Sequence, residues 1–288
     1  MRFHYVDVFT DRPYTGNPLA VFFEEGGLTD ARRQAIAQEV GFSETTFVDP
    51  TPTADGRWMV RIFTPDKEIP FAGHPTLGTA DVIAQHLAPS ADQLVLALGV
   101  GPIPVVREQG RWVMDQNPPA FRPVLTDRAR VASLLSLTED DLEPTLPVRH
   151  ASTGLPCLVV PLRTRGALDQ CRVDAPRYQT WLDEVGPGNL AAFARGSVDP
   201  ECALSVRVFV DASGYYEDPA TGSAAGNLAG YLVEHSVFGS GPLKVVESQG
   251  DQMGRPSRLH LEAWREAGAI RIRVGGGVVP VASGDWLL

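Results

Sequence analysis

The chain contains an internal repeat, and this feature limits its possible fold more than any other. Three blocks of the first half recur in the same order in the second half. The matched pairs are TGNPLAV (15–21) with TGLPCLV (153–159), VRIF (60–63) with VRVF (206–209), and PFAGHP (70–75) with PATGSA (219–224). Each block alone is a weak signal, but their shared order predicts two copies of one fold unit.

Strand-like patterns predominate along the chain, and helical patterns are few. The 28 glycines and 24 prolines add many turn signals, as expected of a strand-rich fold. The regular strand–helix alternation of a doubly wound nucleotide-binding fold is absent, so the pattern indicates an α+β fold instead. A chain of 288 residues suits two domains. Asn117-Pro118-Pro119 is the best candidate for a linker between them.

Several elements have clear sequence signals. A helix ending at about Glu39 is expected to be capped by Thr29 or Asp30 and to stop at Gly41. Residues 65–75 are expected to form a loop. Further helices are expected over residues 76–86, 128–135, 178–185 and 224–234.

Charge and cysteine use exclude several classes of protein. Lys and Arg number 25 against 35 Asp and Glu, so the chain lacks the basic surface of a nucleic-acid-binding protein and is not suited to anionic membranes. It has no run of 18 apolar residues, so we expect no membrane-spanning helix. The three cysteines, at 157, 171 and 202, form no CxxC motif. We therefore expect a reducing, cytoplasmic setting and no metal site.

The two repeated loops form the candidate site. Each loop opens a helix, and the first turn of a helix has free backbone N–H groups and the positive end of the dipole. Two such helix starts facing one cleft between the domains would bind a carboxylate or stabilise an enolate-like anion. Gly73 aligns with Gly222, and both would let a ligand approach the backbone. A tight turn explains either glycine alone, whereas the repeated pair favours a site.

Three ionisable residues in or near these loops are candidates for the chemistry, namely Asp218, His74 and Glu44. Each has an ordinary structural explanation: an Asp before Pro caps a turn, a lone His packs with a hydrogen bond, and a Glu between helix and strand is solvated. As a group they suggest proton transfer without a cofactor. One carboxylate would remove a proton α to an acidifying group, and an acid on the other side would return one.

Two other chemistries have less support from the sequence. A serine hydrolase would need its nucleophile in a GxSxG elbow, but Ser223 lies in TGSAAG. A dinucleotide site would need a helix after its glycines, and none is expected after residues 275–277.

The chain resembles the PhzF-like family of phenazine-biosynthesis isomerases, which shares the diaminopimelate epimerase fold. The FAGHPT and EDPATGSA motifs carry this resemblance most specifically, and the matches span nearly the whole chain in order. The matching stretches are DVFTDRPYTGNPLAVF (7–22), GFSETTFV (41–48), RIFTPDKEIPFAGHPTLGTA (61–80), TGLPCLVVPL (153–162), EDPATGSAAGNLAGYL (217–232), QGDQMGRPSRLHLE (249–262) and VGGGVV (274–279).

The resemblance implies an architecture. It implies two pseudo-symmetric domains, each a curved, mostly antiparallel sheet wrapped around a central helix. The N-terminal domain would cover residues 1–117 and be completed by a strand at about 276–288, and the C-terminal domain would cover residues 118–275. It also implies a homodimer.

The resemblance also implies roles for particular residues. Glu44 of the SETTF motif would be the general acid/base, and His74 and Asp218 would assist it or hold polar groups of the substrate. No metal or coenzyme would take part. The residues expected to bind the substrate are Gly73, Thr221, Gly222 and Ser223.

The leading hypothesis is therefore a cofactor-independent isomerase acting on a small carboxylated substrate, similar to trans-2,3-dihydro-3-hydroxyanthranilate isomerase. The alternatives are a non-catalytic PhzF homologue that binds a small molecule, an amino-acid epimerase or racemase, and a serine hydrolase. The presence of all three ionisable residues argues against a non-catalytic homologue, and the lack of cysteines in the two loops contradicts a two-thiol racemase. Tyr215, Tyr216 and residues before Gly41 are expected to line the pocket.

Overall fold

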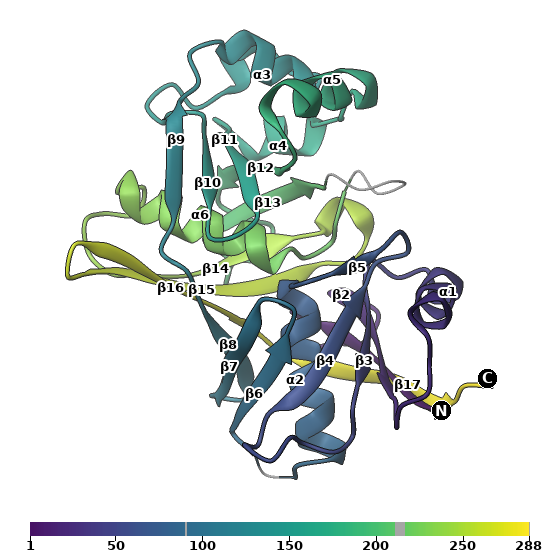
Figure 1. Cartoon of the computed structure of the whole chain (residues 1–288). Helices are drawn as coiled ribbons and strands as arrows, with labels where there is room; N and C mark the ends of the chain where they lie inside the picture. The colour runs from purple at the N-terminus through teal and green to yellow at the C-terminus, as the bar shows by residue number, and fades with distance from the viewer. Residues whose placement is uncertain (90, 211–216, 288) are drawn as a thin grey trace. The chain divides into compact units, whose positions relative to one another are not determined.

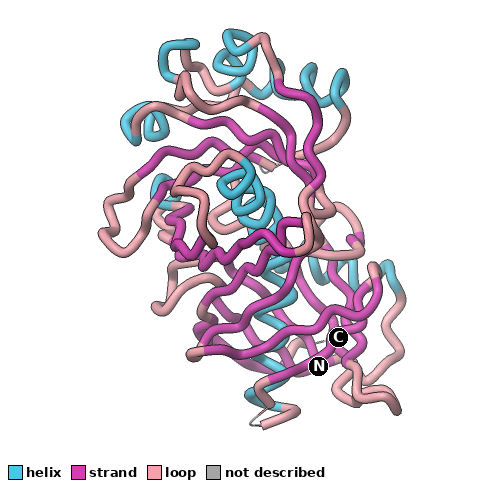
Figure 2. Tube along the Cα trace, turned by 90° about the vertical axis from the view of Figure 1, so that its left-hand side faces the viewer, coloured by secondary structure: helices cyan, strands magenta, loops and turns pink. Residues whose placement is uncertain are grey.

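The computed structural model describes residues 1–89, 91–210 and 217–287 (Figure 1). The chain forms two compact units. Unit 1 comprises Met1–Asp115 and Gly275–Leu288, and unit 2 comprises Gln116–Val274. Strands predominate over helices in both units, as Figure 2 shows, which confirms the expected α+β class. Within the described ranges, no helix is long and apolar enough to cross a membrane.

Among its described residues, unit 1 holds the helices α1 (Asp30–Val40) and α2 (Gly73–His86). Its strands are β1 (Arg2–Val8), β2 (Asn17–Phe23), β3 (Thr45–Val48), β4 (Trp58–Phe63), β5 (Glu68–Ile69), β6 (Gln93–Leu98), β7 (Gly101–Glu108), β8 (Arg111–Gln116) and β17 (Val278–Asp285).

Unit 2 has helices α3 (Arg128–Leu134), α4 (Arg165–Gln170), α5 (Ala175–Val185) and α6 (Gly222–Glu234), with short 3₁₀ turns at Glu139–Asp141 and Asp251–Met253. Its strands are β9 (Ala120–Val124), β10 (Arg149–Ser152), β11 (Pro156–Pro161), β12 (Asn189–Arg195), β13 (Leu204–Phe209), β14 (Leu243–Gln249), β15 (Ser257–Glu266) and β16 (Ala269–Gly276).

The two units follow the same strand pattern. In unit 1, β2 pairs parallel with β3, β3 antiparallel with β4, β4 parallel with β6, and β6 antiparallel with β7. In unit 2, the same four steps run from β11 through β12, β13 and β14 to β15. The second parallel step crosses over through α2 in unit 1 and through α6 in unit 2. The predicted repeat is therefore a repeat of the fold.

The strand registers extend the repeat beyond the matched letters. In unit 1, Thr45 on β3 lies opposite Phe63 on β4, and in unit 2, Leu190 on β12 lies opposite Phe209 on β13. Phe63 and Phe209 end the two VR[IV]F segments. Thr45 and Leu190 are therefore equivalent positions, although their surroundings in the sequence do not match.

Helices α2 and α6 are the buried centres of their units. Nearly every residue of both helices is buried, so strands pack directly against them. Glycines allow this close approach, because a Cβ at Gly78 would lie 2.6 Å from the Leu19 side chain and one at Gly226 would overlap the Gln116 side chain. The expectation of a sheet around a central helix is confirmed in each unit.

Helix α1 begins and ends as its sequence predicts. The Thr29 side chain accepts a hydrogen bond from the Arg32 N–H. Gly41 is in the left-handed conformation with φ 69°, and its N–H donates to the Ala37 carbonyl. A glycine takes this conformation at a helix end with little strain.

One prediction about elements is wrong, and the strand β12 was not predicted. The expected loop over residues 65–75 contains β5 and the first turn of α2, which begins at Gly73. Pro75 fits there because first-turn N–H groups have no acceptor within the helix. In addition, β12 (NLAAFAR) has no strand signal in its sequence. Its alanines favour helix, but pairing with β11 and β13 on its two edges overrides that preference.

Candidate active site

Glu44 sits at the start of β3, just beyond the end of α1. The left-handed Gly41 ends α1 and redirects the chain toward β3. The Glu44 side chain is 17% exposed. A carboxylate in this setting can reach a ligand and still be partly shielded from water, as a general base requires.

His74 is the second residue of α2, and its side chain is buried. Burial lowers its pKa from the usual 6.5 to about 3, and a hydrogen bond with the Pro18 backbone acts in the opposite direction. Because proline has no N–H, the Pro18 carbonyl must be the acceptor and the imidazole the donor. Among the described residues, His74 Nε2 has no hydrogen-bond partner. The donor is therefore Nδ1, which leaves a lone pair on Nε2.

Glu44 and His74 face each other within unit 1. The distance from His74 Nε2 to Glu44 Oε2 is 3.5 Å. Because the imidazole is neutral, this contact is not an ion pair but a carboxyl group beside a nitrogen lone pair. A protonated Glu44 could donate a hydrogen bond to that nitrogen, and an ionised Glu44 could not. The arrangement suits a carboxyl group that gains and loses a proton during a reaction.

Asp218 is fixed in unit 2 by a buried hydrogen-bond network. Its Oδ2 accepts a hydrogen bond from the Thr221 hydroxyl. Gln249, at the end of β14, accepts from the Thr221 N–H at 3.1 Å and donates to the Asp218 carbonyl at 2.7 Å. The Gln249 amide also donates to the Thr221 hydroxyl oxygen. The loop before α6 therefore holds its carboxylate in one orientation.

The starts of α2 and α6 share a further property. Their N-cap residues, Ala72 and Thr221, make no side-chain hydrogen bond to the first turn of the helix. The Thr221 hydroxyl is engaged with Asp218 instead. In both units the N-cap side chain thus leaves the first-turn N–H groups at Gly73 and Gly222 to other acceptors, such as a ligand carboxylate.

The structure therefore places the predicted residues in two local groups. Glu44, His74 and Gly73 belong to unit 1, and the loop from Asp218 to Ser223 belongs to unit 2. Ser223 is partly buried in the first turn of α6. The expected pocket residues Tyr215 and Tyr216 lie outside the described residues.

Sequence reasoning missed two residues that support the second group. Gln249 lies in the matched stretch QGDQMGRPSRLHLE, but nothing in those letters indicates that it holds Asp218. Gln116 donates to the Gly222 carbonyl at 2.9 Å and accepts from the Thr153 hydroxyl at 2.8 Å. The only sequence signal for this contact is Gly226, whose missing side chain leaves room for Gln116.

The cysteines do not provide thiolates for a racemase. All three are buried and free. Burial raises the pKa of each thiol to about 12. The chemistry of these residues therefore disagrees with a two-thiol mechanism, as the sequence of the two loops also does.

Comparison with known proteins identifies the family. The family model described as phenazine biosynthesis-like protein matches residues 6–284. An uncharacterized isomerase of Mesorhizobium japonicum is 35% identical over 98% of this chain and 97% of its own. A trans-2,3-dihydro-3-hydroxyanthranilate isomerase of Pseudomonas aeruginosa is 35% identical over 91% of this chain and 90% of its own.

Solved structures agree with this result. A phenazine biosynthesis protein of the PhzF family from Bacillus anthracis matches all of this chain and 99% of its own with a TM-score of 0.92 and 25% identity. A hydroxyproline epimerase from Agrobacterium vitis, at 12% identity and a TM-score of 0.65 over 99% of this chain and 91% of its own, shares the fold alone. The chain thus has an epimerase-like fold. The chain belongs to the phenazine biosynthesis-like (PhzF) family and is an isomerase.

Proposed function

We propose that this chain is a cofactor-independent isomerase that moves a proton between two positions of a small carboxylated substrate. Glu44 is the general acid/base. Its carboxylate removes a proton from a carbon next to an acidifying group. The resulting carboxylic acid exchanges its proton with solvent and returns a proton to another carbon of the same substrate. The reaction then needs no external oxidant, reductant or coenzyme.

The contact between Glu44 and His74 is the observation that carries this proposal. The neutral imidazole presents a lone pair 3.5 Å from the Glu44 carboxyl group. The imidazole can therefore accept a hydrogen bond from protonated Glu44 while it stays uncharged itself. Such a partner favours the acid form of Glu44 after proton removal, which is the form that must complete the reaction.

The groups of unit 2 are proposed to bind the substrate. Asp218 holds a polar group, and Thr221, Ser223 and the first-turn N–H groups at Gly222 bind the carboxylate. The N–H groups at Gly73 would serve the same purpose in unit 1.

The first substrate to test is trans-2,3-dihydro-3-hydroxyanthranilate, because several relatives of similar identity carry the name of its isomerase. The purified chain is incubated with this compound in deuterium oxide and followed by NMR. We expect consumption of the compound with deuterium appearing at carbon. The Glu44→Gln variant should bind the compound but show no incorporation.

A matched control separates a local effect from a general one. Glu39 is an exposed glutamate on α1 of the same unit, and Glu39→Gln should behave as the wild type. Incorporation by Glu44→Gln at the wild-type rate would rule out the proposed role of Glu44. A wild type that binds the compound without any exchange would instead indicate a binding protein.

We further propose that the chain acts as a cytoplasmic homodimer without a metal or coenzyme. Light scattering after size exclusion should give twice the chain mass of 31.1 kDa. A mass equal to one chain at micromolar concentration would contradict the dimer. Activity that survives dialysis against a chelator would agree with a metal-free reaction.

A further inference from the structure

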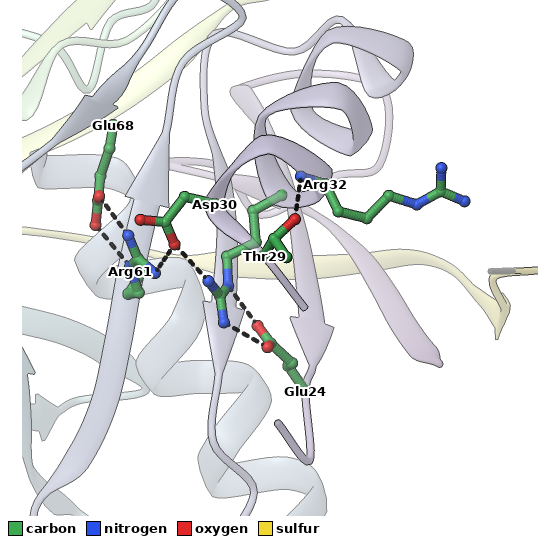
Figure 3. A network of polar contacts seen from close by, with 7 residues as sticks. Glu24, Thr29, Asp30, Arg32, Arg61 and Glu68 are labelled. Atoms are coloured by element: carbon green, nitrogen blue, oxygen red, sulfur yellow. Dashed lines mark hydrogen bonds and ion pairs between the residues drawn. The ribbon is translucent and has the colours of Figure 1, made fainter. Parts of the chain in front are cut away.

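The arginine of the VRIF segment holds the loop that leads to α2. Arg61 on β4 donates from Nε to Glu68 Oε1 at 2.8 Å and from Nη2 to Glu68 Oε2 at 2.5 Å. Its third nitrogen, Nη1, donates to Asp30 at the start of α1, as Figure 3 shows. The guanidinium also lies 5.2 Å from the centre of the Phe63 ring. Glu68 begins the segment that continues through Pro70 into the helix.

The arginine of the VRVF segment makes the same bidentate contact with a glutamate in unit 2. Arg207 donates from Nε to Glu217 Oε1 at 2.8 Å and from Nη2 to Glu217 Oε2 at 2.7 Å. Its Nη1 donates to the carbonyl groups of Leu168 and Cys171 at the end of α4. The guanidinium lies 5.2 Å from the centre of the Phe209 ring, as in unit 1.

The segments that follow the two glutamates are also held alike. Ile69 pairs with Ile62 on β4, and Asp218 occupies the equivalent position opposite Val208 on β13. The Asp218 N–H donates to the Val208 carbonyl at 2.9 Å. Side chains alternate along such an extended segment, so the bond from Arg207 to Glu217 on one side leaves Asp218 directed to the other.

The prolines at the next position pack against equivalent glycines. A Cβ at Gly99, directly after β6, would lie 2.8 Å from Pro70 Cα. A Cβ at Gly250, directly after β14, would lie 3.1 Å from Pro219 Cα. Both loops are therefore fixed on two sides, by a bidentate Arg–Glu pair and by a glycine backbone against a proline.

We propose that Arg207 and Glu217 are positioning residues for the reaction, and that they are the unit 2 copy of a loop-holding device that Arg61 and Glu68 form in unit 1. The part of this inference that concerns the reaction rests on the proposed function. In unit 2 the device orients the Asp218 carboxylate, and in unit 1 it fixes the approach to His74.

The Arg207–Glu217 pair is more buried than the Arg61–Glu68 pair, so we expect it to hold its loop more strongly. The side chains of Arg207 and Glu217 are 5% and 19% exposed, whereas those of Arg61 and Glu68 are 33% and 42% exposed. Water screens an exposed pair far more than a buried one. Loss of the Arg207–Glu217 pair should therefore disturb its loop more than loss of the Arg61–Glu68 pair.

The test combines amide hydrogen exchange with kinetics on the full chain. The variants are Glu217→Gln, Glu68→Gln and the control Glu201→Gln, which removes the charge of an exposed glutamate that pairs with Arg258 in unit 2. Exchange in the peptide over residues 217–222 should quicken about tenfold in Glu217→Gln and stay unchanged in the control. Unchanged exchange in a folded Glu217→Gln variant would overturn the proposal.

The kinetic readout distinguishes positioning from a general loss of stability. If the wild type converts the test substrate, Glu217→Gln should lower kcat about tenfold or more with KM nearly unchanged, because a misplaced catalytic constellation loses transition-state stabilisation. A wild-type kcat in that variant would overturn the positioning role. If the wild type does not convert the compound, this compound is ruled out as the substrate, while the exchange result still decides whether the pair holds the loop.

A second variant covers the case in which Glu217→Gln does not fold. Arg207→Lys keeps the positive charge but cannot make the bidentate contact or reach both α4 carbonyl groups. It should show the same faster exchange over residues 217–222. Protection equal to the wild type would count against the pair as the device that fixes the loop.

Discussion

At the scale of single residues, the charge state of His74 decides how its contact with Glu44 works. With a pKa of about 3, the imidazole is neutral from roughly pH 5 to pH 9. A plot of log kcat against pH should therefore show no change of slope from the titration of His74 in that range. We expect His74→Gln to lower kcat while the shape of its pH profile matches that of the wild type. A change of slope near pH 6.5 that is present in the wild type and absent in the variant would show that His74 titrates there.

Glu247 is the second residue whose ionisation has a measurable consequence. It is fully buried on β14, and within the described part of the chain neither carboxyl oxygen has a hydrogen-bond partner. Burial raises its pKa from 4.5 to about 8, and its charge in turn helps to raise the pKa of the nearby Cys157 thiol. By the registers of β4 with β6 and of β13 with β14, Glu247 is equivalent to Leu96 in unit 1, which is apolar.

The raised pKa of Glu247 predicts how stability depends on pH. The folded state holds this proton more tightly than the unfolded state, so stability falls as the pH rises from about 4.5 to about 8. The slope from this residue is at most about 1.4 kcal/mol per pH unit. Urea unfolding at several pH values should show that slope, and Glu247→Leu should remove it. The control Glu266→Leu, at an exposed position on β15, should keep it.

At the scale of elements, the start of α6 depends on a glycine. A methyl group at Gly226 would overlap the Gln116 amide, which holds the Gly222 carbonyl and the Thr153 hydroxyl. Gly226→Ala should lower the free energy of unfolding by about 1–3 kcal/mol and reduce activity, because the overlap displaces Gln116.

A second helix glycine supplies the matched control. A Cβ at Gly166 in α4 would meet only the Thr164 hydroxyl, at 3.7 Å. Gly166→Ala should therefore raise stability by about 0.5–1 kcal/mol through helix propensity. Equal effects of the two substitutions in chemical denaturation would contradict the account of Gln116.

At the scale of the whole molecule, the two units share one pattern of strands and helices but carry different chemical groups at equivalent positions. Glu44 comes one residue before Thr45, and Thr45 is equivalent to Leu190. The unit 2 counterpart of Glu44 is thus Asn189. Further non-matching pairs are Ile69 with Asp218 and His74 with Ser223. The two copies have therefore diverged in the residues that they carry at these equivalent positions.

The proposed role of Asp218 predicts that a change in unit 2 also impairs the reaction. Asp218→Asn keeps the shape of the side chain but removes its charge, and it should lower deuterium incorporation about 100-fold. The control Asp183→Asn, on the exposed face of α5, should have no effect. Wild-type incorporation by Asp218→Asn would show that Asp218 takes no part in the reaction.

Much of the fold could be predicted from the sequence, because three short blocks record the duplication and helix caps such as Thr29 and Gly41 act locally. The strand β12 could not, since its alanine-rich letters favour helix and only its neighbours make it a strand. Glu44 and His74 were singled out by motif, but their contact depends on how β3 lies beside α2. Gln249 was missed because its role depends on the packing of β14 against a distant loop.

The most direct test of the central proposal is NMR in deuterium oxide with trans-2,3-dihydro-3-hydroxyanthranilate, the wild type and Glu44→Gln side by side. We expect the wild type to consume the compound with deuterium at carbon, and Glu44→Gln to bind it without incorporation. Incorporation at equal rates by both proteins would contradict the assignment of Glu44 as the group that moves the proton.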